Sequence, residues 1–150
     1  MHTFIWQGID EPRMEIAYVE SLDDAHGTQI GLAYELRWQL TGSTLTVDIG
    51  DGPIHHHLDG ADYFDLQHSA FFNSLPVLTD GLLPPGSAPR DYTMRFVAVP
   101  TLTATLTPQR YVPRTASTVT FISGTYEADM DFDLDGYVTL YHEYLRRLHP

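Results

Sequence analysis

The sequence predicts an all-β fold, a strongly curved antiparallel sheet that forms a half-barrel or an incomplete barrel with one or two short helices. Three observations favour it. Apolar and polar residues alternate strictly in four segments, at residues 34–40, 44–49, 101–107 and 126–134. Such alternation is typical of strands in a sheet with one buried and one solvated face. Turn signals separate many of the segments, and patterns that favour helix are scarce.

The expected strands follow one another along most of the chain. They lie near residues 3–8, 13–20, 29–40, 43–50, 53–58, 91–99, 101–107, 117–123, 124–134 and 137–142. Thr41-Gly42 and Asp51-Gly52 occupy turn positions, and Asp135-Gly136 is a stronger hairpin signal because glycine accepts the positive φ that such turns need. An antiparallel sheet of this length must hide its apolar face. With little helix available, it must curl on itself or meet a partner.

One short helix is expected where the strand pattern is interrupted. It would lie within residues 69–75, with Ser69 as N-cap, and stop before Pro76, because a proline disfavours helical backbone in the preceding residue. A further helical turn is expected after Glu143. Gly81–Pro89 has the composition of a loop.

Composition limits the classes of function. The length fits one domain, residues 1–150, with room for a substantial core. The net charge is −12 with eight arginines and no lysine, which argues against binding to nucleic acid or to anionic membranes. The absence of cysteine excludes disulfides, thiolate nucleophiles and cysteine-based zinc sites. No signal peptide and no transmembrane segment is evident, so a cytoplasmic location is expected.

The concave apolar side of such a sheet is the first candidate for a binding site. The side chains expected there are Tyr34, Trp38, Met94, Phe96, Phe121, Met130 and Phe132. They could fill a core, or they could line a groove for an acyl chain or another apolar ligand. The pattern alone leaves both interpretations open.

Polar residues beside apolar ones form a second set of candidates. Asn73 follows Phe72, which is itself a candidate for apolar contact with a ligand, and a buried amide must satisfy its donors and its acceptor. It could brace the chain, or it could offer a polar contact at the rim of a groove. Gln109 and Tyr111, after an expected strand end at Pro108, allow the same two interpretations.

Two patterns resemble metal sites but fit poorly. The aspartates of residues 131–135 match the first half of a calcium-binding loop, yet position twelve is His142 instead of glutamate and the flanks resemble strands. In the run of three histidines, His55 and His57 would share one strand face and supply at most two ligands. We therefore expect no metal and no cofactor.

A catalytic triad of Asp65, His68 and Ser69 is also disfavoured. Neighbours on one strand or turn cannot easily form a chain of nucleophile, base and orienting group, and no G-x-S-x-G motif occurs. No catalytic residue is assigned from the sequence.

Several motifs follow one another in an order and spacing that resemble one bacterial family. They are Trp6-Gln-Gly-Ile-Asp-Glu-Pro-Arg-Met-Glu15, Asp65-Leu-x-x-Ser69-x-x-x-Asn73-Ser-Leu-Pro76-Val77, Val97-x-x-Pro100 with Leu102, Gln109-Arg-Tyr111, and Asp133-Leu-Asp-Gly-Tyr-Val138 with Tyr141. On these motifs the chain resembles the glycolipid-binding family, formerly a domain of unknown function. The resemblance implies a half-barrel like that of bacterial lipoprotein carriers, which hold lipid on a concave apolar face.

The predicted function is non-enzymatic binding of an apolar or amphipathic small molecule, a lipid or glycolipid, in the concave groove. Family members continue the central motif with basic residues, whereas this chain reads Leu78-Thr79-Asp80, so we expect charge to contribute little to holding a ligand. One alternative is a structural or interaction protein whose concave aromatic face forms a homodimer or binds a partner. Another is a hydrolase that acts on bound lipid.

Overall fold

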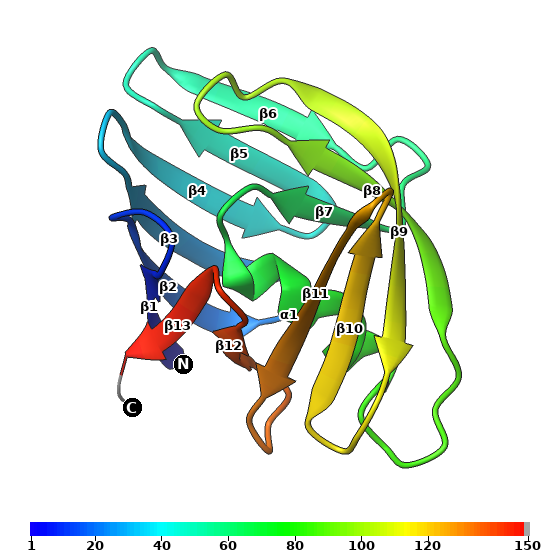
Figure 1. Ribbon diagram of the computed structural model, residues 1–150. Helices are drawn as coiled ribbons and strands as arrows, with labels where there is room; N and C mark the ends of the chain where they lie inside the picture. Colours follow the sequence, from blue (N-terminus) through cyan, green and yellow to red (C-terminus); the bar gives the residue numbers. More distant parts are fainter. Residues whose placement is uncertain (149–150) are drawn as a thin grey trace.

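The computed structural model describes residues 1–148, which form one sheet of thirteen strands around one helix (Figure 1). The strands are β1 (His2–Gly8), β2 (Met14–Ser21), β3 (Asp24–Ile30), β4 (Glu35–Thr41), β5 (Thr44–Asp48), β6 (Pro53–His57), β7 (Tyr63–Leu66), β8 (Arg90–Val97), β9 (Ala104–Pro113), β10 (Thr118–Ser123), β11 (Tyr126–Phe132), β12 (Val138–Tyr141) and β13 (Leu145–Leu148), and the helix is α1 (Ala70–Thr79).

Hydrogen bonds join the strands in the order β6-β5-β4-β3-β2-β1-β13-β12-β11-β10-β9-β8-β7. Neighbouring strands are antiparallel except for β7 and β8, which are parallel. Strands β6 and β7 are the two edges, so the sheet is not closed. It curves around α1, which lies on its concave side (Figure 1). The predicted fold class, an all-β curved sheet with a short helix, is confirmed.

Strand alternation decides which side chains face the helix. In β4 the side chains of Leu36, Trp38 and Leu40 are buried, while the polar residues between them are exposed. Strand β5 repeats the pattern with Leu45 and Val47 buried. Successive side chains of a strand point to opposite faces, so the predicted alternation becomes an apolar concave face.

Helix α1 packs against this apolar face. The indole of Trp38 stacks on Phe71 with ring centroids 5.4 Å apart and meets Phe72 edge-on at 5.1 Å. Gly27 on the neighbouring strand leaves room for the indole, since a Cβ there would lie 2.6 Å from it. Residues Ala70–Val77 are all buried, as expected of a helix enclosed by a core.

Pro76 lies inside α1, so the predicted helix end before it is wrong. Proline lacks an amide hydrogen and normally interrupts a helix interior. Here the carbonyl of Pro76 still accepts a hydrogen bond from the Asp80 amide at 3.0 Å, and burial of the helix favours its continuation. Ser69 is the N-cap residue as predicted, but its side chain makes no capping hydrogen bond.

Two predicted strands have different bounds in the structure. The expected strand at 29–40 is divided into β3 and β4, because the chain turns between Gly31 and Tyr34. The strand expected to end before Pro108 runs through it as β9. Pro108 pairs with Thr93 of β8, and the pairing of β9 with β10 extends only to Arg110, so no neighbour needs the missing amide hydrogen.

Two further segments form strands that the sequence did not predict. The residues after Glu143 form β13, which pairs with β1 and β12, so the predicted helical turn is wrong. The four-residue strand β7 pairs with β8, which follows it in the chain only after α1 and a loop. Both strands depend on partners that local sequence does not reveal.

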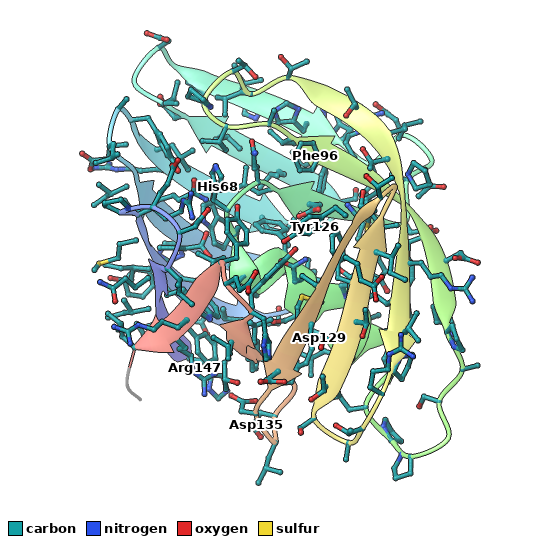
Figure 2. All side chains as sticks on the ribbon, in the orientation of Figure 1. His68, Phe96, Tyr126, Asp129, Asp135 and Arg147 are labelled. Atoms are coloured by element: carbon teal, nitrogen blue, oxygen red, sulfur yellow. The ribbon has the colours of Figure 1, made fainter. Side chains whose placement is uncertain are left out.

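The hairpin predicted at Asp135-Gly136 connects β11 to β12, with Gly136 at a φ of 88°. Figure 2 shows Asp135 at this end of the molecule, away from His68, Phe96 and Tyr126. Asp133 holds the turn, since its Oδ1 accepts hydrogen bonds from the amides of Asp135 and Tyr137.

Of residues 1–148, none belongs to a helix with the length and apolar character that a bilayer crossing requires.

Candidate functional site

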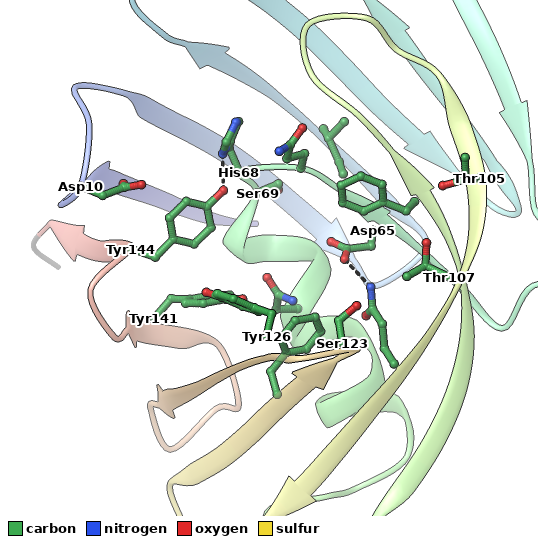
Figure 3. A pocket seen from close by; sticks show the side chains of 16 residues that line it. Asp10, Asp65, His68, Ser69, Thr105, Thr107, Ser123, Tyr126, Tyr141 and Tyr144 are labelled. Carbon is green, nitrogen blue, oxygen red and sulfur yellow. Dashed lines mark hydrogen bonds between the residues drawn. The ribbon is translucent and has the colours of Figure 1, made fainter.

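A pocket of about 670 Å³ opens on the concave side of the sheet, beside α1 (Figure 3). Strands β7 to β12, the segment after β7 and the two turns nearest Asp10 and Tyr144 contribute to it. Its lining residues are Asp10, Asp65, Leu66, Gln67, His68, Ser69, Asn73, Phe96, Thr105, Thr107, Gln109, Phe121, Ser123, Tyr126, Tyr141 and Tyr144. The concave face is thus filled by α1 beside β4 and open beside β9 and β10. Of the two interpretations that the sequence left open, the filled core describes the first region and the groove describes the second.

Aromatic rings form one continuous wall of the pocket. The ring of Phe121 lies 6.1 Å from that of Tyr126 and 6.2 Å from that of Tyr141. Tyr141 in turn meets Tyr144 edge-on at 4.9 Å. Phe96 adds a further ring from β8. Aromatic walls of this kind bind apolar groups and still offer hydroxyl groups at their edges.

Asp65 and Gln109 form a hydrogen-bonded polar pair in the pocket lining. The Gln109 side chain donates from Nε2 to Asp65 Oδ2 at 2.8 Å (Figure 3). Burial raises the pKa of Asp65 to about 6, although the hydrogen bond from Gln109 acts in the opposite direction. Gln109 is only 3% exposed, and its Oε1 has no hydrogen-bond partner within residues 1–148.

Asn73 projects from α1 into the same region. Its Nδ2 donates to the hydroxyl of Tyr111 at 3.3 Å, behind the pocket wall. Asn73 therefore both lines the pocket and ties the helix to β9. The bracing contact that the sequence suggested is present, and a contact to a ligand remains a proposal.

His68 and Tyr144, which both line the pocket, are hydrogen-bonded to each other through His68 Nδ1 and the Tyr144 hydroxyl (Figure 3). His68 has a left-handed backbone with a φ of 68°. Burial and, to a smaller extent, the positive charge of Arg13 lower the pKa of His68 to about 4. The guanidinium of Arg13 lies 5.0 Å from the centre of the Tyr144 ring and pairs with Asp10 at 2.6 Å. His68 is therefore a neutral imidazole at physiological pH.

The hydroxyl of Ser69 donates to Glu15 Oε1 at 2.9 Å, and Trp38 Nε1 donates to Glu15 Oε2 at 3.1 Å. Burial raises the pKa of Glu15 to about 7 even though these donors favour the charged form. Since Ser69 is bonded to Glu15 and His68 to Tyr144, the sequence neighbours Asp65, His68 and Ser69 do not form a triad.

The structure separates the candidate ligand-binding residues into two groups. Asn73, Phe96, Gln109 and Phe121 line the pocket. The others do not: Trp38, Phe72, Met94, Tyr111, Met130 and Phe132 are buried in the core, and Tyr34 is partly buried and donates a hydrogen bond to Gln29. The role of each in binding remains a proposal.

Several lining residues were missed by sequence reasoning. In β9 the threonines Thr105 and Thr107 face the pocket, whereas Leu106 between them is 55% exposed. Alternation identified this strand but did not show which face is concave. Tyr126 begins β11 and belongs to an alternating segment, but the alternation did not show that it lies at the pocket. Tyr144 lies between β12 and β13, where no periodic pattern marks it.

The other polar patterns are occupied by structural contacts. His142 bonds Asp131 at 2.9 Å, and Arg147 bonds Asp133 at 2.6 Å. His55 and His57 are exposed on the edge strand β6, where each imidazole Nδ1 is bonded to a threonine hydroxyl of β5. Within the described part of the chain, no three His, Cys, Asp or Glu side chains are grouped closely enough to hold a metal ion.

The curved open sheet, the enclosed helix and the amphipathic pocket define a class of β half-barrel proteins with a pocket on the concave face. Residues 49–147 match the profile of the family described as "Putative glycolipid-binding", and the chain belongs to this family. The resemblance identified from the motifs is therefore confirmed.

A solved structure supports the same fold. The chain is similar over 99% of its length to a DUF1089 family protein from Pseudomonas aeruginosa, of which 94% is covered, with a TM-score of 0.62 and 16% sequence identity. At this identity the similarity shows the fold alone. No curated protein matches the chain.

Proposed function

We propose that the chain acts as one non-enzymatic binding domain for an amphipathic small molecule, a lipid or glycolipid, held in the pocket on the concave face. The observation that supports this proposal most is the pocket itself. Its volume of about 670 Å³ lies within the range of roughly 300–1,000 Å³ that is usual for ligand sites. The family's description as glycolipid-binding agrees with it.

The lining combines apolar surface with hydrogen-bonding groups, as an amphipathic ligand requires. Phe96, Phe121 and Tyr141 offer apolar surface, whose burial against an acyl chain contributes ~25 cal/mol per Å². Asp65 and Gln109 offer hydrogen-bonding groups next to this surface, since Asp65 is paired with Phe96 across β7 and β8. A ligand with an apolar tail and a polar headgroup would satisfy both.

The same contacts favour binding over hydrolysis. A nucleophilic serine needs an adjacent base, but the Ser69 hydroxyl donates to buried Glu15 instead of His68. Partner binding through the concave aromatic face is less favoured than ligand binding, because Trp38, Phe72 and Met130 are already buried within the chain.

Equilibrium titration with an uncharged monoacylglycerol whose acyl chain carries an anthroyloxy fluorophore tests the proposal. We expect saturable binding of one probe per chain. Thr107→Trp, which fills the pocket from β9, should weaken binding about tenfold or more, since even one displaced apolar contact of 1.4 kcal/mol gives that factor.

Thr93→Trp is the matched control, because Thr93 is exposed on the neighbouring strand β8 and does not line the pocket. This variant should bind the probe like the unmodified chain. Absence of probe binding, or equal binding by the Thr107→Trp variant, would contradict the proposed function.

A further inference from the structure

The charged groups that line the pocket are all acidic. Asp10 lies at its rim and Asp65 on its wall, and no arginine is among the lining residues. Arg13 is 8% exposed, and its guanidinium is bonded to Asp10 and placed over the Tyr144 ring. An anionic headgroup entering this pocket would therefore meet the Asp65 carboxylate, whose hydrogen-bond partner Gln109 is uncharged, while the positive charge of Arg13 is already paired with Asp10.

Gln109 provides a second, independent observation. Its Nε2 is committed to Asp65, and its Oε1 is a buried acceptor without a partner within residues 1–148. A buried acceptor that has lost its water costs free energy until a donor reaches it. A ligand hydroxyl can supply that donor, whereas a phosphate or carboxylate group has none to give at neutral pH.

The remaining polar lining is rich in hydroxyl groups. Thr105, Thr107, Ser123 and Tyr126 line the same pocket as the Asp65–Gln109 pair. A hydroxyl both donates and accepts hydrogen bonds, so these groups match the hydroxyls of an uncharged headgroup in either direction. An ammonium group, which only donates, would leave the donors of the lining unused.

We propose that this pocket selects its ligand by headgroup charge, admitting uncharged headgroups that carry hydroxyls and excluding anionic ones, with Asp65 and Gln109 as the residues that determine the specificity. The inference rests on the proposed function, since it concerns the same pocket. It adds the chemical class of the headgroup and the two side chains that recognise it. A hydroxyl of the headgroup donates to Gln109 Oε1 or to Asp65, and the carboxylate repels an anion.

Competition against the anthroyloxy probe tests the selectivity with three amphiphiles that share one tail: decyl glucoside, decyl phosphate and decylamine, each below its micellar concentration. We expect decyl glucoside to displace the probe at a concentration at least about tenfold lower than decyl phosphate, since like charges at a site disfavour the wrong partner strongly. Decylamine should not bind more tightly than decyl glucoside.

Asp65→Asn removes the charge and preserves the shape of the side chain. In this variant the ratio of the displacing concentrations, decyl phosphate over decyl glucoside, should fall to about threefold or less. Asp91→Asn is the control, because Asp91 is exposed on β8 outside the pocket, and its ratio should equal that of the unmodified chain. Asp10→Asn, at the exposed rim, should reduce the ratio partially, and it gives a second test if the Asp65 variant does not fold.

The outcomes separate the two proposals. If the probe binds, and decyl phosphate displaces it at the same concentration as decyl glucoside or a lower one, the proposed charge selection is overturned. The proposed function then stands. Decylamine as the tightest of the three would overturn it too, since charge attraction would then dominate over hydroxyl recognition. If the probe itself does not bind, the proposed function fails first.

Discussion

Glu15 is the only carboxylic acid within residues 1–148 that is fully enclosed, at 2% exposure. It lies between Trp38 on β4 and Ser69 at the start of α1, and accepts a hydrogen bond from each. Burial raises its pKa from 4.5 to about 7, because removal from water disfavours the charged form more than the two donors favour it. Glu15 thus connects the sheet to the helix, and the free energy that its burial costs depends on pH.

The pH dependence of stability should report this burial. Between the unfolded and folded pKa values the folded chain binds more protons, so the free energy of unfolding falls as the pH rises through this range. A shift from 4.5 to about 7 corresponds to about 3 kcal/mol. In Glu15→Gln this loss should be absent, so the stability of the variant relative to the unmodified chain should rise by about 3 kcal/mol between about pH 5 and pH 8.

Urea unfolding of both chains at the two pH values provides the measurement. Asp65 titrates with the same sign, but it is present in both chains and cancels in the comparison. Glu35→Gln, at an exposed position of β4, is the control and should show no such change. A stability difference for Glu15→Gln that does not vary with pH would contradict the raised pKa.

At the scale of elements, the packing of α1 in the curved sheet depends on close contact between the helix and the hairpin of β11 and β12. The hairpin between β11 and β12 meets the end of α1 at Gly136 and Leu78. A Cβ on Gly136 would lie 2.2 Å from Leu78 Cδ2, and the residue has a φ of 88°. The hairpin therefore needs glycine both for its turn and for contact with the helix.

Two glycine substitutions should separate these requirements. Gly42→Ala, in the turn between β4 and β5, has a φ of 59° and no atom within 4 Å of the added Cβ, so it should cost only the backbone strain of about 1 kcal/mol. Gly136→Ala adds the clash with Leu78 and should cost about 2 kcal/mol more. Chemical denaturation measures both, and equal losses would show that the helix contact does not constrain the hairpin.

Much of this architecture could be predicted from the sequence, because strand alternation is a local property. The buried set Leu36, Trp38 and Leu40 follows directly from the pattern of β4. Helix α1 shows the limit of local reasoning. Its passage through Pro76 depends on burial among residues far along the chain, and tertiary burial of this kind overrides a local helix breaker.

The pocket was less predictable than the fold. Asn73, Phe96, Gln109 and Phe121 line it as expected of a groove, but Trp38 and Phe72 pack against each other. A periodic pattern cannot show which part of an apolar concave face a helix will cover. Nor does it show that Thr105 and Thr107 face inward, because the period is the same for both faces of a strand.

At the scale of the whole molecule, the motifs that carry the family resemblance come together in space. Glu15 of the first motif is bonded to Ser69 of the central motif. Asp65 and Asn73 of the central motif are bonded to Gln109 and Tyr111 of a later one. These contacts fix α1 and β7 against the rest of the sheet, and they leave the pocket open where the helix does not reach. Residues of these motifs therefore line part of the pocket, among them Asp10, Asp65, Ser69, Asn73, Gln109 and Tyr141.

Photoaffinity labelling tests this account most directly. An uncharged monoacylglycerol with a diazirine in its acyl chain, irradiated with the protein and followed by peptide mass spectrometry, reports where an apolar tail lies. We predict saturable labelling on peptides that contain Phe96, Phe121 or Tyr126, abolished in the Thr107→Trp variant. Labelling that does not saturate, or that is spread over the exposed faces of β4 and β5, would contradict a ligand site on the concave face.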